Sequence, residues 1–238
     1  MFNADVLEKG LWACAIVLQA ALVMRIVEKN LLFSLRWFVA WLATEVAVAI
    51  LLIWTPISSA TYFRVWSVAQ PALCILRVAA AWELVRRTVN NRRGKEFTRY
   101  HALAAGAVAC SLALSGFSLR IERYLMHCSA WQYSIVLVNR AVWTSIAIIA
   151  SAVFLTRWIR RSWPLDRNTA VHGALLVAIA FVESGRYLTV AYSHGRSTVV
   201  ANITTLILEC LLFALWMVWL KPEEEAQAIQ DEEWPLAA

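Results

Sequence analysis

Charged residues are scarce in this chain of 238 residues. They make up 16% of it, whereas soluble domains usually carry about 25%. Glycine (7) and proline (5) are also few, and no stretch rich in Gly, Pro or Ser divides the chain. Hydrophobic residues make up 61%, and the mean hydropathy is +0.61. The composition therefore argues against a soluble domain and indicates a single integral membrane domain.

Sequence motifs for catalysis and for metal binding are missing as well. The five cysteines are scattered without a C-x-x-C pair, which predicts neither a disulfide framework nor a metal site. No H-E-x-x-H, G-x-S-x-G, Walker or Rossmann pattern occurs. This lack of motifs argues against an enzyme.

The residues that would hold a membrane cofactor are misplaced. Retinal would need a lysine in the middle of the last apolar run, and the lysine of that region, Lys221, lies at its end. The histidines are His101, His127, His172 and His194. We expect all four near a membrane surface, which is too shallow for axial haem ligands, so the sequence predicts neither retinal nor haem.

Seven apolar runs are each long enough to cross the hydrocarbon core of a bilayer, which takes about 20 helical residues. Their composition predicts an all-α, polytopic bundle of seven transmembrane helices over residues 1–220, followed by an acidic tail at 221–238. The expected helices span about 7–27, 32–54, 60–86, 99–118, 131–157, 169–192 and 198–220.

Basic residues gather in the first, third and fifth loops between these runs, around 25–36, 86–99 and 157–167. The positive-inside rule then places the N-terminus outside and the C-terminus in the cytoplasm. We expect arginines of these loops to meet anionic lipid headgroups and not nucleic acid. They are Arg86, Arg87, Arg92, Arg93, Arg157, Arg160 and Arg161.

Several ionisable residues lie inside the apolar runs, where a charge is costly and usually functional. Three acids and three arginines occur there, and an arginine cannot shed its charge, so paired burial is expected. Gln70 and Asn202 accompany them at helical spacing, and Gln70, Cys74 and Arg77 are predicted to share one helix face. The resulting candidate site, for a ligand or for ion pairs, comprises Glu45, Gln70, Arg77, Arg140, Glu183, Arg186, Asn202 and Glu209.

The depth of these residues predicts a polar interior that opens toward the outer side. With the N-terminus outside, Glu45, Arg140, Glu183 and Arg186 fall in the outer half of the membrane. Three interpretations stay open: an ion-pair network that fixes the helices, a ligand pocket, and a proton or ion path.

The order of features resembles a family of uncharacterised seven-helix bacterial integral membrane proteins. The resemblance covers nearly the whole chain and is carried by five short features. They are LQ at 18–19 with a basic exit near Arg25, YFRVW at 62–66, Arg140 before a long apolar run, HG at 172–173, and KPE at 221–223. Acids often stand in that family where this chain has Gln70 and Asn139. The resemblance implies the fold and a bacterial inner-membrane location, and it implies no activity.

Two functions are compatible with these patterns. The first is a non-enzymatic sensory or accessory membrane module, with a buried Glu/Arg network and an acidic cytoplasmic tail that docks a protein partner. The alternative is a small proton- or ion-linked transporter. The few glycines and prolines argue against the alternative, because transporters often contain repeated broken helices.

Overall fold

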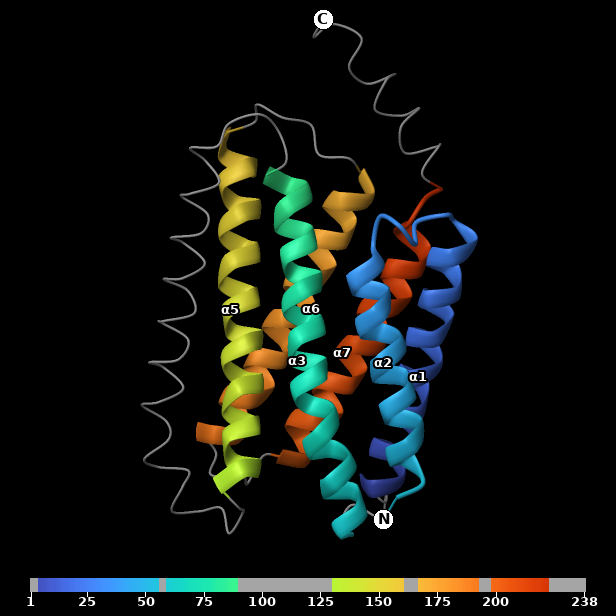
Figure 1. Ribbon diagram of the computed structural model, residues 1–238, viewed down its shortest axis with the longest axis vertical. Coiled ribbons are helices and arrows are strands. Elements are labelled where there is room, and N and C mark those ends of the chain that lie inside the picture. Colours follow the sequence, from blue (N-terminus) through green and yellow to red (C-terminus); the bar gives the residue numbers. More distant parts are fainter. Residues whose placement is uncertain (1–3, 56–58, 90–129, 161–166, 193–197, 223–238) are drawn as a thin grey trace, which may run out of the picture.

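Six helices form the part of the chain that the structure, a computed structural model, describes: residues 4–55, 59–89, 130–160, 167–192 and 198–222. Labelled as in Figure 1, they are α1 (Ala4–Glu28), α2 (Arg36–Ile53), α3 (Ala60–Val89), α5 (Ala130–Arg160), α6 (Arg167–Tyr192) and α7 (Thr198–Trp219). No strand occurs within these ranges, so the all-α prediction is confirmed there. The expected helix at 99–118 and the acidic tail from residue 223 lie outside them.

The helices form a closed ring, because each packs against its neighbours in the order α1, α2, α3, α5, α6, α7, and α7 packs back on α1. Helix α3 also touches α6 inside the ring. In Figure 1, α1, α3, α5 and α7 run upward from the end nearest the N-terminus, whereas α2 and α6 run downward. We call the lower end the N-terminal end and the upper end the C-terminal end.

Each of the six helices is long and apolar enough to cross a membrane. Large apolar side chains also cover the outside of the ring, among them Val68, Val200 and Val218. Exposure of so large an apolar surface to water would be unfavourable, whereas lipid tails are themselves apolar and can cover it. The length, the composition and this surface together indicate a helical membrane protein.

Helix α1 ends in a Schellman motif, and α2 therefore begins at Arg36 and not at residue 32 as expected. Asn30 adopts a positive φ of 58°. Its backbone N–H bonds the carbonyl of Val27 (3.0 Å), and the N–H of Leu31 bonds the carbonyl of Ile26 (3.0 Å). Leu31 and Ile26 are both buried, as this motif favours. The left-handed conformation of Asn30 changes the direction of the chain, so the next helix begins only at Arg36.

The first turn of α2 is completed by a side chain of α3. Its N-cap residue, Leu35, provides no side-chain cap. The backbone N–H of Trp37 donates instead to the Glu83 carboxylate, at 3.1 Å. A carboxylate at this position also faces the positive end of the helix dipole. This contact therefore fixes the start of α2 against the end of α3.

Candidate functional site

Asn139 of α5 is the hub of a hydrogen-bonded group between α3 and α5. Its Oδ1 accepts from Arg77 Nη1 (2.8 Å) and from the Cys74 thiol (3.2 Å). Its Nδ2 donates to Gln70 Oε1, at 3.0 Å. Gln70, Cys74 and Arg77 follow each other at spacings of four and three, which places them on one face of α3. A single buried amide therefore engages one whole polar face of α3.

Arg77 joins this group to α2 and to the aromatic core. Its Nη2 lies 3.2 Å from Glu45 Oε1, and the two side chains are 7% and 27% exposed. Its guanidinium also lies over the ring of Trp143, 4.9 Å from the centroid. Ion pairing, the bond to Asn139 and a cation–π contact together compensate the buried charge.

A second cluster joins α6 and α7. Arg186 Nη2 and Nε donate to Glu183 Oε2, at 2.6 and 3.1 Å. The Arg186 guanidinium lies 4.5 Å from the centroid of the Tyr187 ring. Glu209 of α7 interacts electrostatically with Glu183. The residues at i, i+3 and i+4 on α6 thus form one charged unit, and Glu209 reaches it from α7.

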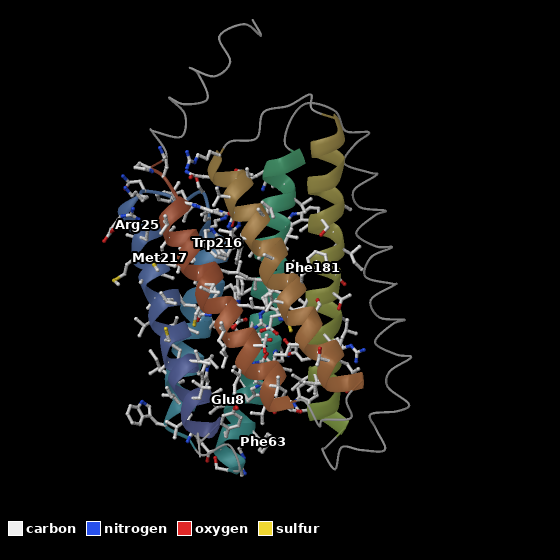
Figure 2. The ribbon with its side chains drawn as sticks, turned by 180° about the vertical axis from the view of Figure 1, so that it is seen from behind. Glu8, Arg25, Phe63, Phe181, Trp216 and Met217 are labelled. Atoms are coloured by element: carbon white, nitrogen blue, oxygen red, sulfur yellow. The ribbon has the colours of Figure 1, made fainter. Side chains whose placement is uncertain are left out.

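Electrostatic interactions connect the two clusters, since Glu183 acts on both Glu45 and Arg77. We call the combined set the interior network. Its members come from five helices, and polar atoms gather at mid-height of the bundle in Figure 2. They are Glu45, Gln70, Cys74, Arg77, Asn139, Glu183, Arg186 and Glu209.

Aromatic rings fill the bundle between the interior network and the C-terminal end. We call this set the aromatic layer: Phe38, Trp41, Trp143, His172, Phe213 and Trp216, all of them buried. The ring of Trp143 contacts Trp41 (5.6 Å between centroids), Trp41 contacts Phe38 (5.4 Å), and Phe38 contacts Trp216 (4.4 Å). The layer starts at Trp143, which the Arg77 guanidinium contacts, and continues toward the C-terminal end as far as the first turns of α2 and α6.

Polar side chains continue instead toward the N-terminal end. Asn202 of α7 donates to Glu8 Oε1 of α1, at 3.0 Å. Tyr62 of α3 interacts electrostatically with Glu8. Figure 2 shows Glu8 close to the lower end and Trp216 in the upper half. The bundle interior is therefore polar on one side of the interior network and aromatic on the other.

The structure brings some of the predicted site residues together and places others elsewhere. It brings together Glu45, Gln70, Arg77, Glu183, Arg186 and Glu209. Asn202 was expected to share a site with Glu209, and its amide bonds Glu8 instead. Arg140 is buried and has contacts of its own. His172 lies in the first turns of α6, where its ring is 1% exposed and packs between Phe38 and Trp216.

Sequence reasoning did not select two of the hydrogen-bonding partners. Asn139 stands beside Arg140 in an apolar run, and its polarity at that depth was the available signal. Glu8 lies near the start of α1, where the sequence is equally compatible with a solvated side chain and with one that bonds another helix. No group of three or more metal-ligating side chains occurs among the described residues.

The arginines expected at lipid headgroups are described only in part. Arg86 is exposed and Arg87 half-buried in the last turn of α3, at the C-terminal end. Arg157 and Arg160 belong to the last turns of α5, where the helix alone is described. Arg92, Arg93 and Arg161 lie outside the described residues.

Fold and site together define the class of this chain: a helical membrane protein with charged side chains paired in its interior. No protein-family model, curated protein or solved structure matches the chain. The resemblance to a bacterial seven-helix family therefore stays a prediction.

Proposed function

We propose that this chain is a non-enzymatic sensory or accessory module of a bacterial inner membrane, with its interior network reached from the outer side. The asymmetry of the bundle interior carries this proposal. Asn202 and Glu8 continue the polarity toward the N-terminal end, whereas buried rings such as Trp41 and Trp216 separate the network from the C-terminal end. A small polar ligand that enters at the N-terminal end would be stopped at the aromatic layer.

The proposal includes seven membrane crossings, with the N-terminus outside. The course of α3 and α5 supports the seventh crossing, because both run in the same direction and the chain between them has to return. The distribution of charge supports the orientation, because Lys9 and Arg64 stand near the N-terminal end and most described basic residues stand at the other. Those are Arg25, Lys29, Arg36, Arg86, Arg87, Arg157, Arg160, Arg167 and Lys221.

A signal needs a route from the site to the cytoplasm, and the helices provide one. Five helices meet at the interior network, so a ligand there changes contacts of all five together. At the C-terminal end, Asn168 of α6 holds the end of α7 through two hydrogen bonds to the Lys221 backbone, at 3.0 and 3.1 Å. The acidic residues that follow Lys221 are the proposed dock for a protein partner, and the basic ends of the helices are proposed to contact anionic lipid.

Removal of residues 223–238 tests the sensory proposal while leaving Lys221 and Pro222 in place. We expect a partner that co-purifies with the full chain to be lost from the truncated chain, which keeps its helical content. A matched full-length variant with glutamine in place of Glu223, Glu224 and Glu225 separates the charge of the tail from its length. Recovery of the same partners with both variants would refute the proposed docking role.

A proton-linked carrier is the second candidate, and the electrostatic interaction between the Glu183 and Glu209 carboxyl groups favours it. Carboxyl groups at membrane depth are common in proton pathways. In each transport cycle, the rings of the aromatic layer would have to move apart to open a path to the C-terminal end. It predicts a pH-dependent proton flux into vesicles that contain the purified chain, and a loss of that flux in Glu209→Gln. Equal flux in vesicles with and without the protein would eliminate this candidate.

A further inference from the structure

We propose that the first part of α3, residues 60–70, is a gate that opens the interior network toward the N-terminal end by swinging away from α5. We call this segment the arm. Its hinge is Pro71, and the hydrogen bond between Gln70 and Asn139 holds it closed. The gate rests on the proposed function in one respect, because it supplies the route by which a ligand from the outer side would reach the network.

Pro71 lies inside α3 and weakens the helix at one point. Proline has no backbone N–H, so the carbonyl of Ser67, four residues earlier, loses its helical partner, and the proline ring crowds that carbonyl. Sharp bends in long helices are commonly found at such positions. In Figure 1 the lower part of α3 leans away from the line of its upper part. The helix is therefore easiest to bend at the level of the interior network.

The two sides of this hinge are packed very differently. No side chain from 59 to 72 is buried, and the structure describes all of these residues. The buried side chains of α3 all follow this range and are each at most 6% exposed: Leu73, Cys74, Arg77, Ala80, Leu84 and Val85. A segment with few buried contacts is displaced at low cost. The upper part of α3 is therefore anchored in the bundle, whereas the arm is held mainly at its surface.

The arm has a complete helix start of its own, so it can move as one piece. Ser59 precedes it, and its Oγ accepts from the backbone N–H of Tyr62, at 3.1 Å, as an N-cap does. The Ser59 carbonyl accepts from the N–H of Phe63, at 3.3 Å. The rings of Tyr62 and Phe63 pack with their centroids 5.8 Å apart. These contacts lie within the arm and its cap, so they are kept when the arm swings.

Asn139 holds the arm closed and keeps hydrogen-bond partners when the arm opens. Its Nδ2 donates to Gln70 Oε1, at 3.0 Å, and to the carbonyl of Ile135 on its own helix, at 3.3 Å. The Ile135 carbonyl stays in place when Gln70 moves away, so opening leaves no buried donor unpaired on α5. The Asn139 Oδ1 stays bonded to Arg77 and Cys74, which lie beyond the hinge. Opening therefore breaks the bond to Gln70 and preserves the rest of this group.

Distances between pairs of spin labels, measured by pulsed electron paramagnetic resonance on the purified full-length chain, test the gate. The labels are attached to introduced cysteines in a chain whose native cysteines are serine. One label replaces Arg64 in the arm, and the other replaces Trp131 near the start of α5; both side chains are exposed. We expect two distances, a shorter one for the closed arm and a longer one for the open arm.

Two substitutions should shift these populations in opposite directions. Pro71→Ala restores the missing N–H and stiffens α3, so the longer distance should be reduced or lost. Gln70→Leu keeps the size of the side chain and removes the acceptor for Asn139. The ratio of open to closed arms should then rise about fivefold, which is the effect of losing one hydrogen bond.

A label pair beyond the hinge is the matched control. Val78 of α3 and Ile148 of α5 are both exposed, and their distance should be single and equal in all three chains, which also shows that the variants fold. If one variant alters this control distance, the other decides. Identical distributions at the arm pair in the unaltered chain and the variants would overturn the gate. The measurement uses no ligand or partner protein, so its failure is distinct from a failure of the tail truncation to release partners.

Discussion

At the scale of single residues, Arg77 shows how a charge is accommodated inside this bundle. A charged side chain at the centre of a bilayer costs several kcal/mol unless partners compensate it. Arg77 has three different partners: the Glu45 carboxylate, the Asn139 amide and the Trp143 ring. They come from two helices, so the same contacts that stabilise the charge also fix α2 and α5 against α3.

Replacement of Arg77 by methionine should lower the free energy of unfolding by about 3–5 kcal/mol, because the Glu45 carboxylate is left without its partner. The double variant Arg77→Met/Glu45→Gln should regain most of this loss. Unfolding of the purified protein in mixed detergent measures both variants. Val78→Met, at a half-exposed neighbouring position, is the control and should be nearly neutral. Additive losses in the double variant would show that the pair is not coupled.

At the scale of elements, the turns and helix ends determine how the ring closes. The Schellman motif at Asn30 sets the angle between α1 and α2, and Glu83 positions the start of α2. Also at the C-terminal end, Asn168 connects the start of α6 to the end of α7. Its side-chain amide donates one hydrogen bond to the Lys221 backbone and accepts another from it. The contact from Glu83 therefore takes the place of the side-chain cap that the start of α2 lacks.

The positive φ of Asn30 gives a prediction with a matched pair of substitutions. Alanine at this position should destabilise the protein by about 1–2 kcal/mol, because its Cβ opposes a left-handed conformation. Glycine should leave the stability unchanged or raise it slightly. Thermal unfolding in detergent distinguishes the two variants. If the alanine variant were as stable as the glycine variant, Asn30 would not be strained in the folded protein.

The Asn168–Lys221 contact predicts slow hydrogen exchange at a helix end that would otherwise fray. The backbone N–H of Lys221 donates to Asn168 Oδ1, so its exchange should be slow in the unaltered chain. Asn168→Ala removes both bonds and should accelerate exchange of this amide, whereas Asn168→Asp keeps an acceptor and should retain much of the protection. Exchange at Lys221 that does not respond to Asn168→Ala would contradict the contact.

At the scale of the whole molecule, the sequence was most informative where local spacing decides the structure. Apolar length predicted helices long enough to span a membrane, and spacing along one helix predicted the face shared by Gln70, Cys74 and Arg77. Contacts between helices were harder to predict, because they depend on how each helix is rotated. Asn202 therefore meets Glu8 and not Glu209, and Asn139, next to Arg140, is the residue that bonds Arg77.

In the function that we propose, the interior network is reached from the outer side, and the aromatic layer separates it from the cytoplasm. Two positions on α3 test it: half-buried Gln70 in the network, and fully buried Ala80 beyond Arg77. Each is replaced singly by cysteine in a chain whose native cysteines are serine. Both variants are then exposed to a charged, membrane-impermeant thiol reagent from either side.

Labelling from each side of sealed vesicles shows from which end of the bundle the interior network is reached. We expect Gln70→Cys to react with reagent added outside and not with reagent enclosed on the cytoplasmic side. Ala80→Cys should react from neither side. Labelling of Gln70→Cys from the cytoplasmic side, or from neither side, would refute access from the outer side. Labelling of Ala80→Cys as strong as that of Gln70→Cys would refute the separation by the aromatic layer.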